Sequence, residues 1–202
     1  DISKLRPRGD ELALYEDSND PFNFLLDLYD PATNMGAIVP IHSWLSPAAL
    51  IKKAKWDENL TVNDDGEYFC RVVLSAKAIM AENNTLCYYR KYIDKSVPSL
   101  SGGLDEKSLQ SQYRSLLLKR EHLTQFKKDE RIDKVIAINL MILLMRAYPE
   151  FKELSKTISE SIEKLGGTTY VPILGGKLVE FIKSIFGWKT ARRLQFYFHK
   201  TR

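Results

Sequence analysis

The sequence has few of the residues that build covalent or metal-held frameworks. It contains two cysteines, Cys70 and Cys87, and three histidines among 202 residues. Two cysteines do not make a disulfide framework, and neither has a histidine or another cysteine at the spacing of zinc ligands. We therefore expect a reducing, cytoplasmic compartment and no structural zinc site.

The sequence also lacks a long apolar run, a secretory leader and a phosphate-binding loop. The longest apolar run, residues 135–145, is about half the length that a bilayer span needs and predicts a buried helix. No basic stretch followed by an apolar run opens the chain, which argues against a signal peptide. The glycine pairs lack the lysine or the glycine spacing of phosphate loops. Because the first residue is Asp1, we expect the chain to begin within a longer protein.

Charge is unevenly distributed along the chain. The composition, 44% hydrophobic and 28% charged, is typical of a folded globular protein. Residues 1–103 carry 11 Lys and Arg against 15 Asp and Glu, whereas residues 104–202 carry 19 against 11. This split predicts two regions, 1–103 and 104–202, with an anionic partner such as a membrane surface for the second. The net charge is only +4, and the sequence contains no recognised nucleic-acid-binding module, which argues against nucleic-acid binding.

Hydrophobic patterns predict an α/β fold class: a short mixed sheet with helices, followed by an all-helical C-terminal region. Apolar spacing predicts helices over residues 22–29, 48–55 and 64–77. Runs of β-branched and aromatic residues predict strands over 35–41, 79–82 and 86–92. After residue 103 the pattern predicts helices only, over 109–126, 135–145 and 149–165.

The C-terminal segment, residues 177–202, alternates basic with aromatic and aliphatic side chains. Such a helix can lie in a membrane interface with its lysines toward lipid phosphates. It can equally pack on the preceding helices as an ordinary C-terminal helix. The sequence leaves both interpretations open.

Three carboxylates stand where the helix over 64–77 begins. Asn63 or Asp64 is a suitable N-cap, and Asp65 and Glu67 follow in the first turn. Acids at this position stabilise a helix by about 0.3–1 kcal/mol each, so stabilising the start of the helix could be the whole role of these three residues. Alternatively, like charges this close raise one another's pKa, which suits a carboxylate to general-base catalysis.

Histidines and a tryptophan are the other candidate site residues. His42 and Trp44 follow the predicted strand over 35–41, at the end where binding residues gather in α/β sheets. A lone histidine can equally be a structural partner. His122 and His199 are isolated on predicted helices, and we expect them to be solvated.

Four segments occur in an order that resembles the acceptor-side half of bacterial family 2 glycosyltransferases. They are residues 37–60 (AIVPIHSWLSPAALIKKAKWDENL), 63–71 (NDDGEYFCR), 88–91 (YYRK) and the serine-containing loop 96–101. The match covers roughly residues 35–101 and implies a partial GT-A-type fold. The resemblance makes 1–103 the acceptor-side half of a catalytic domain and 104–202 a helical extension. The nucleotide-binding half and its Asp-x-Asp motif are not found in residues 1–34.

The resemblance implies transfer of a sugar, with inversion, from a nucleotide-sugar donor to a hydroxyl of a sugar or lipid-linked acceptor. Asp65 falls at the place of the catalytic base, Asp64 at that of the acid before it, and Glu67 at that of a later acid. Arg71 would orient the base. A divalent metal, Mg or Mn, is expected in the complete enzyme, although its ligands are not found in this chain.

The same resemblance makes His42, Trp44, Arg71 and Arg90 candidates for substrate binding, with the tryptophan stacking on a sugar face. It places the protein in the cytoplasm, where it could attach peripherally to the inner face of the membrane through residues 177–202. The alternative is a non-enzymatic helical adaptor or membrane-surface domain in which the acids at 64–67 only cap a helix.

Overall fold

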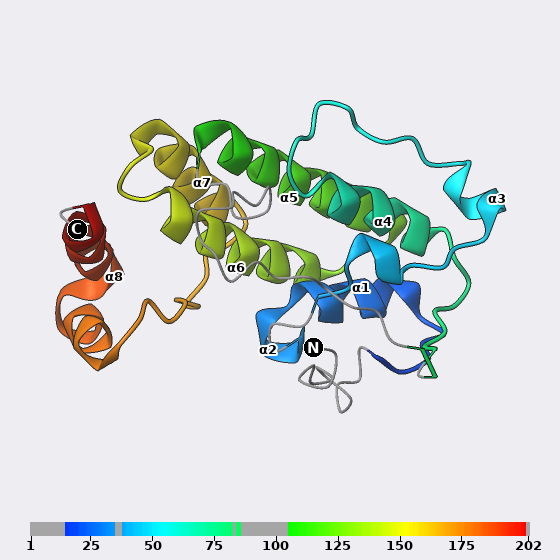
Figure 1. Ribbon diagram of the computed structural model, residues 1–202, viewed down its shortest axis with the longest axis horizontal. Coiled ribbons are helices and arrows are strands. Elements are labelled where there is room, and N and C mark those ends of the chain that lie inside the picture. The colour runs from blue at the N-terminus through cyan, green and yellow to red at the C-terminus, as the bar shows by residue number, and fades with distance from the viewer. Residues whose placement is uncertain (1–14, 35–37, 83, 86–104, 201–202) are drawn as a thin grey trace, which may run out of the picture.

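The described part of the chain is helical (Figure 1). The structure is a computed structural model that describes residues 15–34, 38–82, 84–85 and 105–200. Its elements are α1 (Pro21–Tyr29), α2 (Pro31–Asn34), the 3₁₀ helix η3 (Ile41–Ser43), α3 (Ala48–Ile51), α4 (Asp64–Leu74), α5 (Glu106–Phe126), α6 (Glu130–Ala147), α7 (Lys152–Lys164) and α8 (Lys177–Lys200).

The predicted α/β fold with a mixed sheet is wrong. Within the described residues, strand-like pairing is confined to one antiparallel bridge between Ser18 and Ile79, with N···O distances of 2.9 and 2.8 Å. In the predicted strand over 35–41, residues 38–40 have no regular structure and η3 begins at Ile41. Val39 packs against the helical core. Pro40 has no backbone N–H to donate to a neighbouring strand. The predicted strand over 86–92 lies outside the described residues.

Aspartates begin three of the helices. Asp20 accepts a hydrogen bond from the backbone N–H of Asn23 at 3.0 Å, and Asp105 accepts one from Ser108 at 2.9 Å. Asp129 caps α6 in the same way. Such caps satisfy N–H groups that have no partner within the helix. The helices α1, α5, α6 and α7 overlap the ranges that the sequence predicted, although α6 begins earlier than expected, at Glu130.

A single apolar core joins α1, α4, α5, α6 and α7. In Figure 1, α5 and α6 run side by side, and α6 also contacts α1 and α7. Fully buried side chains at the centre include Leu25 of α1, Leu109 of α5, Leu140 of α6 and Ile158 of α7. The core thus contains residues from both predicted regions, 1–103 and 104–202.

The last helix, α8, lies at one end of the bundle, beyond α6 and α7 (Figure 1). It bends at Gly187, whose φ of 78° and ψ of 163° are not helical. This backbone region is open almost only to glycine. None of the helices in the described ranges is long and apolar enough to cross a membrane.

Candidate functional site

The acidic turn that opens α4 is held in a defined conformation. Asn63 precedes the helix in the left-handed region, with φ at 62°, and Asp64, Asp65 and Glu67 follow in the first turn. A Cβ on Gly66 would lie 2.2 Å from Asn63 Oδ1, so a larger residue here would require the Asn63 side chain to move.

Polar side chains of α5, spaced four residues apart, hold the segment that leads into α4. Ser111 Oγ accepts hydrogen bonds from the N–H groups of residues 61 and 62 at 2.9 and 3.0 Å. Ser115 Oγ donates to the carbonyl of Asn63 at 2.9 Å, and Lys119 Nζ donates to Asn63 Oδ1 at 3.3 Å. This row on α5 positions the start of α4.

Glu67 is paired inside the protein. Its side chain is 3% exposed, and Arg71 donates from Nε and Nη2 to its two carboxylate oxygens at 2.7 and 2.8 Å. His122 Nε2 lies 2.7 Å from Oε1 of the same carboxylate. Burial would raise the pKa of Glu67, but the hydrogen bonds from Arg71 and His122 outweigh it and lower that pKa. These contacts make Glu67 and Arg71 part of the α4–α5 junction.

His122 was expected to be solvated, and this expectation is wrong. Its side chain is 19% exposed and engages Glu67. The two residues are 55 positions apart, so no local pattern indicates the pair.

Two buried ionisable side chains, Cys70 and Lys119, and the half-buried Tyr29 lie beside this junction. Burial raises the pKa of the Cys70 thiol to about 11 and raises the pKa of the Tyr29 phenol. Burial also lowers the pKa of Lys119, whose Nζ lies 4.9 Å from the centre of the Tyr29 ring. Because a thiol with so high a pKa stays protonated at neutral pH, Cys70 is not an activated nucleophile.

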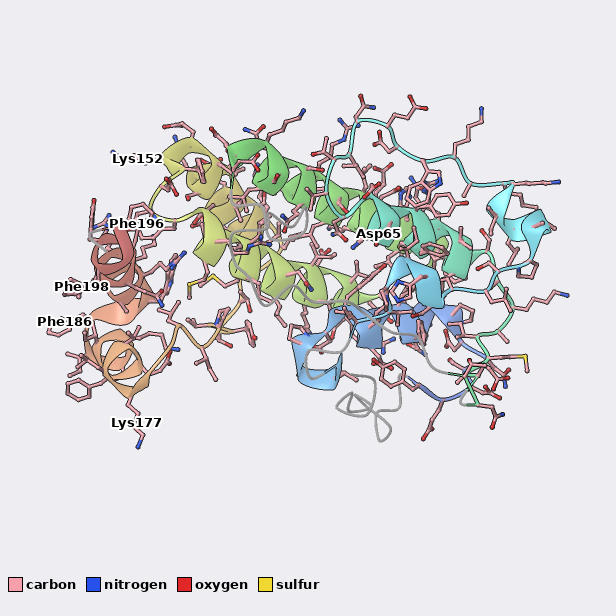
Figure 2. The ribbon with its side chains drawn as sticks, in the orientation of Figure 1. Asp65, Lys152, Lys177, Phe186, Phe196 and Phe198 are labelled. Carbon is pink, nitrogen blue, oxygen red and sulfur yellow. The ribbon has the colours of Figure 1, made fainter. Side chains whose placement is uncertain are left out.

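Asp65 is the acid of this turn that lines a hollow in the protein surface. Its Oδ1 accepts a hydrogen bond from the N–H of Gly66 at 2.7 Å, and Oδ2 has no hydrogen-bond or ion-pair partner among the described residues. In Figure 2 it lies where α4 faces α1. The carboxylate borders a hollow of about 40 Å³, lined by Leu25, Leu28, Tyr29, Val39, Trp44, Asp65, Gly66 and Phe69.

Trp44 forms one wall of this hollow, and His42 does not line it. The Trp44 ring stacks on Phe69 with centroids 5.2 Å apart and meets the edge of Phe24 at 6.2 Å. His42 is exposed on η3. Arg90 lies outside the described residues. The structure therefore brings Trp44 to Asp65 and leaves His42 on the surface.

The described residues do not form a metal site. Within residues 15–34, 38–82, 84–85 and 105–200, no three His, Cys, Asp or Glu side chains group closely enough to hold a metal ion. Asp64 and Asp65 are adjacent on α4, but Glu67 is turned into its ion pair with Arg71. The resemblance placed the ligands of its divalent metal outside this chain, so the absence of a metal site among these residues does not test that expectation.

Comparisons with known proteins give no relative for this chain. No family model, no curated protein and no solved structure matches it. Family 2 glycosyltransferases of the GT-A type are built on a mixed sheet, whereas the described residues form helices and no strand. The predicted membership of that family is contradicted by these findings.

Proposed function

We propose that this chain activates an acceptor hydroxyl for sugar transfer, with Asp65 as the general base. The observation that supports the proposal is the Oδ2 atom of Asp65, which has no partner among the described residues and borders an aromatic-lined hollow. A carboxylate beside aromatic rings is a combination that suits an acceptor alcohol, because the carboxylate oxygen accepts a hydrogen bond from the hydroxyl group while the rings contact apolar C–H groups.

The contacts around Asp65 hold its carboxylate in one orientation. The bond from Gly66 N–H to Oδ1 fixes the rotamer of Asp65, and the row on α5 fixes the turn that carries it. The Lys119 ammonium interacts electrostatically with Asp65 from the buried side. A base positioned in this way is ready to accept a proton without reorganisation.

The chemistry assigned to Asp65 is a single proton transfer. Oδ2 takes the proton of the acceptor hydroxyl while that oxygen bonds to the anomeric carbon of the donor. The bond between this carbon and the nucleoside diphosphate breaks, with inversion. No step is assigned to a metal on the described residues, since they do not form a metal site.

The size of the hollow limits what binds inside it. Ligand pockets usually measure about 300–1,000 Å³, whereas this hollow measures about 40 Å³. It accommodates a hydroxyl group or a water molecule and not a sugar ring. The proposal therefore places the rest of the acceptor, and the nucleotide-sugar donor, outside the hollow.

The test is the Asp65→Asn variant, assayed for release of nucleoside diphosphate from a panel of nucleotide sugars with sugar and lipid-linked acceptors. Loss of a general base lowers the rate by about 10²–10⁴-fold. Glu130→Gln, an exposed acid on α6, is the matched control and should keep full activity. Circular dichroism checks that both variants fold.

A binding measurement complements the activity assay. Acceptor sugars should shift the indole N–H resonance of Trp44 in the NMR spectrum of the native chain, and less so in Asp65→Asn. Turnover of Asp65→Asn at the native rate would contradict the proposal, as would a Trp44 resonance that no acceptor shifts.

A further inference from the structure

The first segment of α8 presents its apolar side to solvent. Leu178, Phe181, Ile185 and Phe186 follow the i, i+3, i+7, i+8 spacing of a single helix face. Each of them is more than half exposed, between 56% and 72%. A helix that packs on a core normally turns such a face inward.

The polar side of the same segment faces the protein. Glu180 accepts a hydrogen bond from the N–H of Leu174 at 2.6 Å and pairs with Lys183. Lys183 Nζ donates to the carbonyl of Pro172 at 3.1 Å. The contacts of these two charges therefore orient the segment with its apolar face outward.

The second segment of α8, after the bend at Gly187, attaches the helix to the bundle through a different set of residues. Trp188 meets the edge of Tyr148 with ring centroids 5.4 Å apart, and Ala191 is buried. Arg192 Nε donates to the carbonyl of Met145 at 2.8 Å. Residues on the other side of this segment, Leu194, Tyr197 and Phe198, are exposed.

Figure 2 shows Phe186 and Phe198 on the side of α8 that faces away from α6 and α7. Both segments of the bent helix therefore carry apolar and aromatic side chains on the outer side of the molecule. Exposed apolar patches of this kind mark interaction sites rather than ordinary surface.

Basic side chains accompany this outer surface. Lys177 and Lys189 are exposed on α8, whereas the Arg193 guanidinium lies over the Tyr148 ring, 5.3 Å from its centre. The single acid of α8, Glu180, is turned toward the protein. Aromatic and aliphatic side chains flanked by lysine and arginine are the composition of helices that lie in a membrane interface. The positive charges complement anionic headgroups and would repel a basic protein surface.

We propose that α8 docks this protein onto the surface of an anionic phospholipid bilayer. Leu178, Phe181, Ile185 and Phe186 enter the boundary between headgroups and acyl chains, and Tyr197 and Phe198 extend the contact beyond the bend. The exposed basic side chains reach lipid phosphates. This docking does not depend on the activity proposed for Asp65.

The test is flotation of the full chain with vesicles of phosphatidylcholine alone and of phosphatidylcholine mixed with phosphatidylserine. The native chain should float with the anionic vesicles and bind the neutral vesicles more weakly. High salt should weaken binding to the anionic vesicles, because it screens the exposed charges.

An apolar variant separates docking from folding. The combined change F181Q, I185Q and F186Q alters only exposed side chains, so the helical circular dichroism should be retained. Its partition onto anionic vesicles should fall by at least about tenfold. Met80→Gln, a change at an exposed apolar residue far from α8, is the matched control and should bind like the native chain.

A charge variant tests the lipid preference. The combined change K177Q and K189Q should lower the affinity for anionic vesicles by about fivefold per basic residue and leave the weak binding to neutral vesicles unchanged. Failure of the native chain to float would overturn the proposal, as would equal flotation of the apolar variant. Conversion of a dimer to a monomer by the apolar variant, without any vesicle binding, would show instead that a second copy covers this surface.

Discussion

The carboxylate of Glu67 is the side chain that most directly links α4 to α5. It receives Arg71 from its own helix and His122 from the next, at 2.7 Å each. Truncating one member of a buried ionic group leaves the others without partners, which costs more than the pairing itself contributes. The pKa of Glu67 is lowered in the folded protein, so its ionised form favours folding.

Glu67→Gln should lower the free energy of unfolding at neutral pH by about 1–3 kcal/mol. The native contribution is complete above the ordinary pKa of 4.5 and is lost as the pH falls through the lower folded value. The destabilisation by Glu67→Gln should therefore shrink as the pH falls below 4.5, which urea unfolding at several pH values measures. Glu130→Gln, at an exposed acid, should change stability little. If Glu67→Gln lowered the free energy of unfolding equally at acidic and neutral pH, the stabilisation would not come from an ionised Glu67.

At the scale of elements, the start of α4 depends on atoms supplied by α5. Ser111, Ser115 and Lys119 contact residues 61–63, and the turn closes around Gly66. In an isolated helix, alanine is more favourable than glycine by about 1 kcal/mol. Here a Cβ would meet Asn63 Oδ1 at 2.2 Å and Lys119 Nζ at 2.7 Å.

Gly66→Ala should therefore destabilise the protein, by about 1–3 kcal/mol, because moving Asn63 Oδ1 and Lys119 Nζ away from the new methyl group disrupts the hydrogen bond between them, which outweighs the gain in helix propensity. Thermal unfolding followed by circular dichroism measures this effect. Gly176→Ala is the matched control, since no atom lies within 4 Å of its added Cβ. A higher melting temperature for Gly66→Ala would show that the turn opens without cost.

At the scale of the whole molecule, one core crosses the boundary at residue 103. Leu25 of α1 and Cys70 of α4 share an apolar cluster with Leu140 of α6 and Ile158 of α7. Elements that bury their apolar faces against one another unfold together. We therefore expect the described helices α1 and α4–α7 to unfold as one unit.

Leu140→Ala should cost about 2–5 kcal/mol, since it removes a fully buried side chain at the centre of the core. The variant should therefore unfold at a lower denaturant concentration than the native chain. For each of the two proteins, tryptophan fluorescence and circular dichroism should give the same midpoint as one another. Leu45→Ala, at a fully exposed residue, should leave the midpoint unchanged. Two separate transitions would instead indicate that residues 1–103 and 104–202 fold independently.

Part of the candidate site was predictable from the sequence, and part was not. The three acids at the start of α4 are local features, so the start of that helix and the position of Asp65 within it were predictable, although the Asn63 side chain bonds to Lys119 and does not cap the helix. The partner of Glu67 on α5 and the stacking of Trp44 on Phe69 join distant segments, and no spacing along the chain encodes them.

The sequence by itself determined where the long helices run, because apolar periodicity, aspartate caps and glycine ends act within a few residues of the backbone they direct. The short apolar runs over 35–41 and 79–82 were ambiguous, since a strand exists only if another strand pairs with it. The tertiary structure decided that Val39 packs on helices instead. It also decided which face of α8 is exposed, because that depends on where Glu180 and Lys183 find backbone partners.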